Sequence, residues 1–255
     1  MRPVGLDEVL LRLHQVDIRR PVSLNNYQEV FAPFYHPDTF RELSNLRLLL
    51  EKNLDRVGAF IELLILSRLH GHTAAYFSAY TIGDRCISPA KQRLVNLKRR
   101  QSPEHRPVVP RLIRRAAEVL ADGFSSSFFD VSQKSRVVQG DGSRLNWVGA
   151  ESIDFILTQP PLPVEDVSAV CTDQWIERWF CGVEEETAGL IEGDARWNKL
   201  MHELLTEIAR VLKPGSHAAI EVAEVEGPRG KISYDRSILK IIEEDSVLRR
   251  IFAVE

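Results

Sequence analysis

The sequence predicts an α/β fold in which a mainly helical region, residues 1–134, precedes an α/β domain, residues 135–255. Two observations support this division. In the first region apolar residues recur at the three- and four-residue spacing of amphipathic helices. From Ser135 onward, short apolar runs of strand length alternate with helical stripes. Such alternation is typical of a mostly parallel sheet.

Composition and charge are those of an ordinary globular chain. It has 255 residues, 44% hydrophobic residues and a formal net charge of −3. No apolar run reaches the length of a membrane span. Asp7, Glu8 and Arg12 stand among the first leucines, which does not resemble a secretory signal. The three cysteines have no metal-ligand spacing, so we expect reduced thiols, no metal site and a cytoplasmic location.

Helical spacing predicts the elements of the first region. Helices are expected over residues 6–20, from residue 38 or 39 onward, over 55–70 and over 111–121, with a polar, irregular segment from 71 to 110. His36-Pro37-Asp38 marks the entrance of the second helix, and Asp38 or Thr39 is placed to cap it.

The second region should contain the sheet. Strands are expected over residues 135–141, 152–159, 218–222 and 248–254, and helices over 172–182, 197–212 and 237–244. The helix at 197–212 has an almost unbroken apolar stripe, and Lys213-Pro214-Gly215 should end it.

Two of the expected strands end in residues suited to a ligand. Ligands of open α/β sheets bind outside the carboxyl ends of the strands. At Gly140-Asp141-Gly142, small residues allow close approach, and the carboxylate can accept hydrogen bonds from ribose hydroxyls or an amine; a plain turn is the alternative. At Thr158-Gln159-Pro160-Pro161, the prolines either simply end the strand or form a rigid lip whose carbonyl groups face a ligand.

A basic segment stands out against the mildly acidic average. Residues 91–115 contain nine Lys or Arg and a single acid, Glu104. Such a segment suits contact with nucleic-acid phosphates, although a solvated surface is an equal alternative. The arginines expected to contact nucleic acid are Arg99, Arg100, Arg106, Arg111 and Arg114.

Six motifs in order carry a resemblance to a known family. They are "FYHPDTFRELSNLR", "LHGH", "VVQGDGSRL", the Pro-Pro loop, "ERWFCG" and "RVLKPG", spread over residues 31–221. The chain resembles prokaryotic DNA amino-methyltransferases, which make N4-methylcytosine or N6-methyladenine. The resemblance implies a partial class I methyltransferase (Rossmann-like) sheet, S-adenosylmethionine as cofactor, DNA as partner and a role in restriction-modification, with the target base flipped from the duplex.

The resemblance also implies roles for the two strand ends. Gln159, Pro160, Pro161 and Leu162 correspond to the catalytic lip that receives the base amine. Gly140, Asp141 and Thr158 correspond to cofactor-binding positions.

The chain departs from the family pattern in three places. Gln159 replaces Ser, Asn or Asp, Leu162 replaces an aromatic residue, and no Phe-x-Gly-x-Gly cofactor loop occurs. Two functions therefore stay open. One is a DNA amino-methyltransferase, weak alone or completed by a second chain that supplies the loop. The other is a catalytically inactive subunit that binds nucleic acid or protein.

Overall fold

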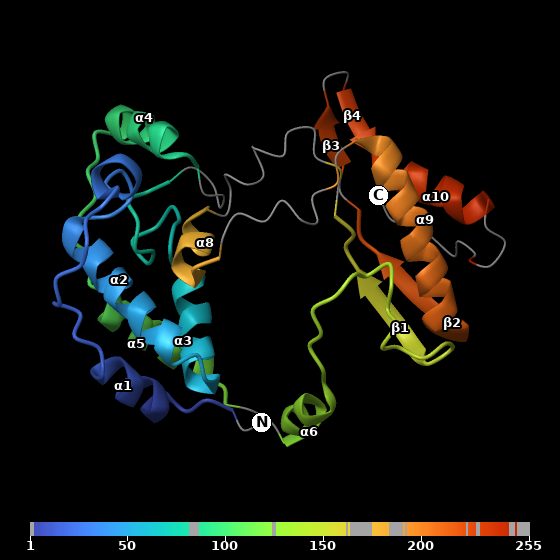
Figure 1. Cartoon of the computed structure of the whole chain (residues 1–255), viewed down its shortest axis with the longest axis horizontal. Coiled ribbons are helices and arrows are strands. Elements are labelled where there is room, and N and C mark those ends of the chain that lie inside the picture. The colour runs from blue at the N-terminus through green and yellow to red at the C-terminus, as the bar shows by residue number, and fades with distance from the viewer. Residues whose placement is uncertain are drawn as a thin grey trace. The chain divides into compact units, whose positions relative to one another are not determined.

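In the computed structural model, the chain divides into two compact units (Figure 1). Unit 1 comprises Met1–Ser135 and Ser168–Glu186, and unit 2 comprises Arg136–Val167 and Thr187–Glu255. The structure describes residues 3–81, 87–123, 126–161, 163, 175–183, 191, 193–222, 224–227, 230–244 and 248.

Unit 1 is built from helices. They are α1 (Leu6–His14), the π-helical turn η1 (Tyr27–Phe31), α2 (Pro37–Lys52), α3 (Arg56–Leu66), α4 (Pro89–Arg99), α5 (Val108–Leu120), α6 (Ser126–Lys134) and α8 (Trp175–Cys181). The helices expected near residues 55–70, 111–121 and 172–182 are confirmed. The first helix is shorter than expected, and α4 lies inside the segment expected to be irregular.

The start of α2 corrects the expected cap. His36 is the N-cap, because its Nδ1 accepts a hydrogen bond from the Asp38 amide at 3.2 Å, and Pro37 takes the first helical position. Neither Asp38 nor Thr39 caps the helix. The Thr39 hydroxyl instead accepts a hydrogen bond from the Arg106 amide at 2.8 Å, which joins α2 to the segment before α5.

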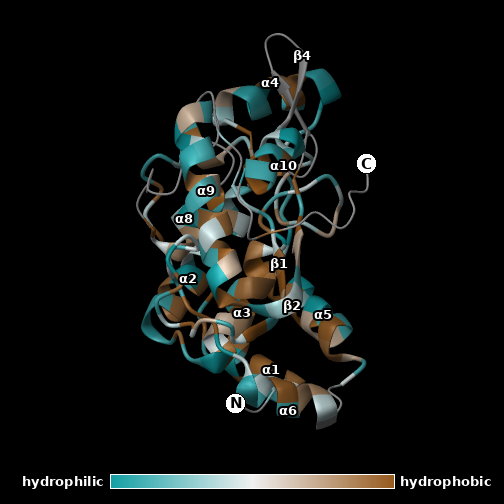
Figure 2. Cartoon of the chain, turned by 90° about the vertical axis from the view of Figure 1, so that its right-hand side faces the viewer, coloured by the Kyte–Doolittle hydropathy of each residue, from teal (hydrophilic) through white to brown (hydrophobic). Residues whose placement is uncertain are grey.

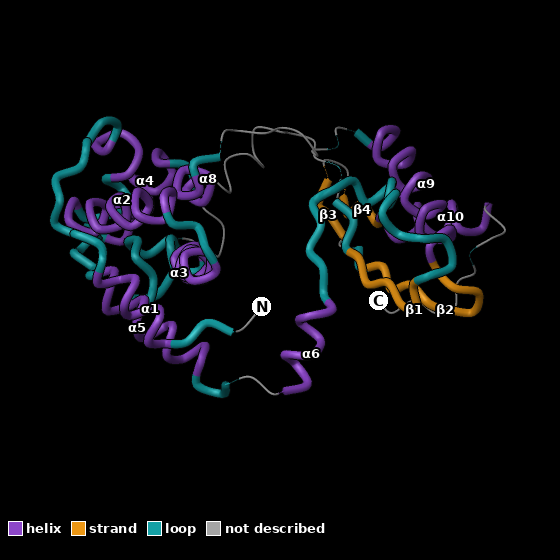
Figure 3. Tube along the Cα trace, turned by 60° about the horizontal axis from the view of Figure 1, so that its bottom comes forward, coloured by secondary structure: helices purple, strands orange, loops and turns teal. Residues whose placement is uncertain are grey.

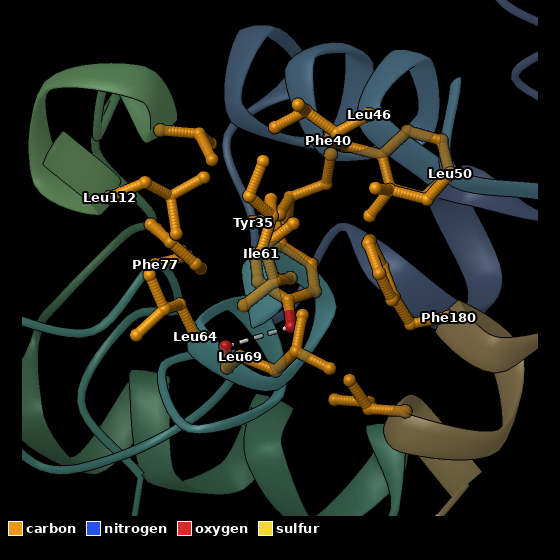
Figure 4. Close-up of a cluster of buried hydrophobic side chains, with 14 of the residues drawn as sticks. Tyr35, Phe40, Leu46, Leu50, Ile61, Leu64, Leu69, Phe77, Leu112 and Phe180 are labelled. Carbon is orange, nitrogen blue, oxygen red and sulfur yellow. Dashed lines mark hydrogen bonds between the residues drawn. The ribbon is translucent and has the colours of Figure 1, made fainter. Parts of the chain in front are cut away.

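The core of unit 1 lies between α2, α3, α5 and α8 (Figure 4). Leucines of α2 meet Ile61 and Leu64 of α3, and Phe180 of α8 closes one side. The buried Tyr35 hydroxyl donates to the Leu69 carbonyl at 2.8 Å (Figure 4), so the one polar group that this ring carries into the core is satisfied.

Unit 2 contains the sheet. Its elements are β1 (Ile153–Thr158), α9 (Asp194–Val211), β2 (Leu212–Ile220), β3 (Glu224–Gly227), β4 (Gly230–Ser233) and α10 (Tyr234–Glu244). The strands β1 and β2 are parallel, with α9 between them in the chain, and β3 and β4 form an antiparallel pair (Figure 3). The mixture of helices with a parallel strand pair agrees with the predicted α/β class.

The junction of α9 and β2 explains an irregularity in this sheet. The helix ends at Val211 and the strand begins at once, so Ile153 pairs with Leu212, whereas Phe155 pairs with His217. The extra residues of β2 include Gly215, whose φ of +80° favours glycine. The helix therefore ends just before Lys213-Pro214-Gly215, as expected, and these three residues belong to the following strand, β2.

One expected strand does not form. Residues 135–139 are irregular, and Val137 is fully exposed. A strand needs a neighbour to accept and donate its backbone hydrogen bonds, and within the described residues β1 pairs with β2 alone. The strand expected at 248–254 lies outside the described residues apart from Leu248, which is not in a strand.

The core of unit 2 forms on one face of β1. Trp197, Met201, Leu205 and Ile208 follow one stripe of α9 and are buried with side chains of α10, while Ile156 of β1 packs against them. Figure 2 shows hydrophilic and hydrophobic residues together along α9, as an amphipathic helix requires.

The opposite face of β1 has no cover among the residues that the structure describes. Phe155 is 58% exposed and Leu157 is 73% exposed, although both are apolar residues of a parallel strand. None of the described helices is long and apolar enough to cross a membrane.

Candidate functional site

A cleft of about 510 Å³ lies in unit 2 at the carboxyl end of β1. Its lining residues are Gly140, Asp141, Gly142, Thr158, Gln159, Pro160, Pro161, Ile191, Arg196, Leu200, Met201 and Leu204. The cleft thus brings the Gly-Asp-Gly segment and the Pro-Pro lip together, from positions almost twenty residues apart in the chain. Leu162, the fourth lip residue, lies outside the described residues.

The lip is fixed to α9 by a buried tryptophan. The Trp197 indole Nε1 donates to the Pro161 carbonyl at 2.9 Å, and the Trp197 side chain is fully buried. The lip also has support from the sheet, since the Glu221 amide donates to the Thr158 carbonyl at 2.9 Å. Gln159 between them is exposed at the cleft. Trp197 begins the apolar stripe of the helix expected over residues 197–212, but the sequence contained no sign of this hydrogen bond.

Asp141 combines a turn with an open carboxylate oxygen. Its Oδ1 accepts hydrogen bonds from the Ser143 amide at 2.9 Å and the Ser143 hydroxyl at 2.8 Å. These two bonds, the backbone one first, lower the pKa of Asp141, so the carboxyl group is ionised at neutral pH. Among the described residues none donates to Oδ2, and Asp141 lines the cleft. Oδ1 therefore has the role expected of a plain turn, whereas Oδ2 is available to a ligand.

The loop between Asp141 and β1 is held by an ion pair of α9. Glu207 accepts a hydrogen bond from the Leu145 amide at 2.7 Å. Arg210 pairs with Glu207 at 2.7 Å and donates to the carbonyls of Leu145 and Val148. The hydrogen bond from Arg210 lowers the pKa of Glu207. The helix therefore positions both sides of the cleft, the lip through its first turn and the Asp141 loop through its last turns.

Trp147 lies against the Gly140 backbone. A methyl group added at Gly140 would stand 2.2 Å from the indole atom Cη2 of Trp147, so only glycine allows this contact. The indole is 49% exposed beside the cleft. Trp147 could not be recognised from the sequence, because it lies in a loop without periodicity.

One arginine of the basic segment, Arg106, is buried and not exposed as expected. Arg106 is 6% exposed, and its guanidinium donates to the carbonyls of Thr73, Tyr76 and Ser78. It therefore holds a loop of unit 1 and is not the surface phosphate contact that the sequence predicted.

The other predicted arginines keep more exposure. Arg99 donates to the Thr81 carbonyl at 3.0 Å, and half-buried Arg111 donates to the Pro107 carbonyl at 3.0 Å. Arg100 and Arg114 are exposed, without a hydrogen bond to the described residues through their side chains. All five belong to unit 1, whereas the cleft belongs to unit 2.

A smaller hollow, of about 310 Å³, lies between α1 and α3. Its charged groups already bind one another: Arg12 pairs with Asp55 at 2.7 Å, and Arg56 pairs with Glu8 at 2.6 Å. Fewer of its charged groups are consequently available to a ligand than in the cleft. Across the described segments, no three His, Cys, Asp or Glu side chains are grouped to hold a metal ion.

Comparisons with known proteins identify no relative, so the function has to be inferred from the geometry of the cleft. No family model, no curated protein and no solved structure matches the chain.

Proposed function

We propose that unit 2 is a partial class I methyltransferase domain that transfers a methyl group from S-adenosylmethionine to the exocyclic amine of a DNA base. The observation that carries this proposal is the single cleft shared by the Gly140-Asp141-Gly142 segment and the Pro-Pro lip. The cleft stands at the carboxyl end of a parallel strand, where ligands of α/β sheets bind.

The Asp141 end of the cleft fits the nucleoside part of the cofactor. The open oxygen of Asp141 can accept hydrogen bonds from ribose hydroxyls, and Gly142, where an added methyl group would meet only Leu204 at 3.8 Å, leaves the backbone accessible. Leu200 and Leu204 of α9 supply an apolar wall for a ring. When bound, the cofactor supplies an activated methyl group; the residues of the chain supply its orientation.

The lip fits the acceptor amine. The lone pair of such an amine is delocalised into its ring, which makes the nitrogen a poor nucleophile. The Gln159 side-chain oxygen and the Pro160 carbonyl can accept its two hydrogens, and none of the hydrogen bonds among the described residues ends on the Pro160 carbonyl. These bonds would aim the lone pair at the methyl group, and alignment of this kind accounts for much of the rate in such transfers.

The bare face of β1 supports the proposal that a second chain completes the site. Parallel sheets are covered on both faces, whereas Phe155 and Leu157 are exposed and the described part of the sheet has only two parallel strands. We propose that the partner adds a strand-and-helix segment that carries the glycine-rich cofactor loop. The alternative, an inactive subunit, is favoured by Leu162 and Gln159 in place of the family residues.

Labelled methyl transfer to DNA tests the proposal. The purified chain should bind S-adenosylhomocysteine weakly and transfer few methyl groups, and transfer should rise at least tenfold when the product of the neighbouring upstream gene is added. Asp141→Asn should weaken nucleoside binding. Asp154→Asn, a change at an exposed carboxylate outside the cleft, should leave that binding unchanged.

The possible results separate the two functions. DNA binding without any cofactor binding, with and without the added protein, would support the inactive subunit and reject the enzyme. Strong transfer by the chain alone would reject the need for a second chain.

A further inference from the structure

Arg196 is a cation of the cleft whose charge is not paired with any residue that the structure describes. It lines the cleft and is exposed, and no hydrogen bond or ion pair joins its side chain to another described residue. Its charged neighbours on α9 have other contacts. Asp194 accepts a hydrogen bond from the Tyr234 hydroxyl at 3.2 Å, and Lys199 lies 4.0 Å from Glu203.

The position of Arg196 places it at the lip. The next residue in the chain, Trp197, donates to the Pro161 carbonyl, so the first turn of α9 adjoins the lip. At the other end, Leu204 approaches Gly142, where an added methyl group would be 3.8 Å from Leu204 Cδ1. Leu204 follows Trp197 by seven positions, which corresponds to about 10 Å along the helix. Arg196 and the Asp141 segment thus line one cleft, Arg196 from the first turn of α9 and the Asp141 segment beside Leu204, farther along the helix.

This arrangement suits a ligand that reaches from the atom held at the lip to an anionic group elsewhere in the same molecule. A base held at the lip is attached to a phosphate backbone, which supplies that anion. Arginine binds phosphate through two parallel hydrogen bonds, and an exposed guanidinium without an internal partner has both available. By contrast, Arg106, the most buried arginine of the basic segment, already donates to three carbonyls.

We propose that Arg196 binds the backbone phosphate of the nucleotide whose base enters the lip. This inference rests on the proposed function, in which the lip binds the base amine. It adds a contact between unit 2 and the nucleic-acid backbone. The phosphate contact serves to hold the nucleotide while the lip orients its amine.

The salt dependence of oligonucleotide binding tests this contact. The probe is a mixed-sequence single-stranded DNA of twenty nucleotides, whose base needs no extrusion from a duplex. Each phosphate neutralised on a single strand contributes a slope of about −0.7 to the logarithm of affinity plotted against the logarithm of salt concentration. Arg196→Gln should therefore flatten the slope by about 0.7 and weaken binding at low salt by several fold.

A matched control is available in the same unit. Arg236 of α10 is an exposed arginine outside the cleft lining, and Arg236→Gln removes the same charge. It should leave the slope within error of the unmodified chain. Arg196→Lys should recover most of the slope, because the charge returns, but less of the affinity, because the two parallel hydrogen bonds do not.

S-adenosylhomocysteine provides the second arm. If Arg196→Gln weakens binding of this carboxylate-bearing probe and leaves DNA binding unchanged, Arg196 holds the cofactor and the proposal is overturned. Equal slopes for both glutamine variants, or no DNA binding by the unmodified chain at low salt, overturn it as well. A flattened slope with no cofactor binding in any variant would support the phosphate contact while rejecting the methyltransferase.

Discussion

At the scale of single residues, Gly140 and Trp147 form the most constrained contact of the cleft. Gly140→Ala should push the indole away, because the new methyl group would stand 2.2 Å from Trp147 Cη2. Overpacking of this kind costs about 1–3 kcal/mol, and we expect the low end because the indole is half exposed. The thermal midpoint of unit 2 should fall and the Trp147 emission should change.

Gly142→Ala is the matched control for that experiment. Its added methyl group would meet Leu204 Cδ1 at 3.8 Å, an ordinary contact, so its stability should stay near that of the unmodified chain. If the two alanine variants unfolded at the same temperature, the Trp147 contact would have no structural role.

At the scale of elements, α9 determines the shape of the cleft through Trp197. Trp197→Phe keeps an aromatic ring in the core but removes the hydrogen bond to Pro161. We expect unit 2 to lose about 1–2 kcal/mol of stability, from the lost bond and the smaller ring, measured by denaturant unfolding. The methyl transfer proposed for the completed site should fall further than this loss explains, because the lip would be less well fixed.

Tyr234→Phe is the control for the element-scale change. It removes the hydroxyl that donates to Asp194 from the same core without touching the lip. A variant of Tyr234 that reduced methyl transfer as strongly as Trp197→Phe would argue against a special role of the lip contact.

The start of α3 in unit 1 should make stability depend on pH. Asp55 caps this helix, and the hydrogen bond from Arg12 is the largest cause that lowers its pKa to about 2. Since the pKa is lower in the folded chain, the stabilisation is present above the ordinary value near 4 and is lost as the pH falls towards 2. Asp55→Asn keeps a capping side chain, so it should flatten this dependence in acid unfolding curves. Asp122→Asn should not, because it changes an exposed carboxylate after α5 that makes no hydrogen bond or ion pair with the described residues.

The elements with a continuous buried face were predictable from the sequence. The helix α9 and the strand β1 have apolar patterns set by a core, and both lie where expected. The helix α4 was missed because only Gln92 and Val95 of it are buried, although Ser88-Pro89 is a usable start signal. The strand expected at 135–141 failed since its formation depends on a neighbour that local sequence does not specify.

The candidate site could be predicted only in part, for a similar reason. The lip follows from its position after β1. Gly140 and Asp141 line the cleft as expected, although the strand expected before them does not form. Arg106 could not be recognised as buried, because its acceptors belong to a loop thirty residues earlier in the chain. Arg196 and Trp147 have no local pattern that connects them with the cleft, which forms only when α9 packs beside β1.

At the scale of the whole molecule, unit 2 exposes a sheet face that other parallel sheets bury. The chain should therefore bind a hydrophobic dye or self-associate when it is alone. Exchanging Phe155 and Leu157 together for threonine should reduce dye binding at little cost in stability, because both side chains are exposed. Ile156→Thr, on the packed face, should instead destabilise unit 2 by about 1–3 kcal/mol. Unchanged dye binding in the double variant would mean that the dye binds another surface and not this face of β1.

Under the proposed function, the two prolines of the lip would also determine which bases the cleft accepts. Proline has no backbone N–H, so Pro160 and Pro161 present oxygen atoms alone, and Trp197 occupies that of Pro161. A base that presents an amino group there forms a hydrogen bond. A base that presents a keto oxygen would meet another oxygen and lose its bond to water, at a cost of about 1–3 kcal/mol. Under the proposed function, adenine and cytosine would thus be separated from thymine and the keto edge of guanine by the backbone oxygen of Pro160.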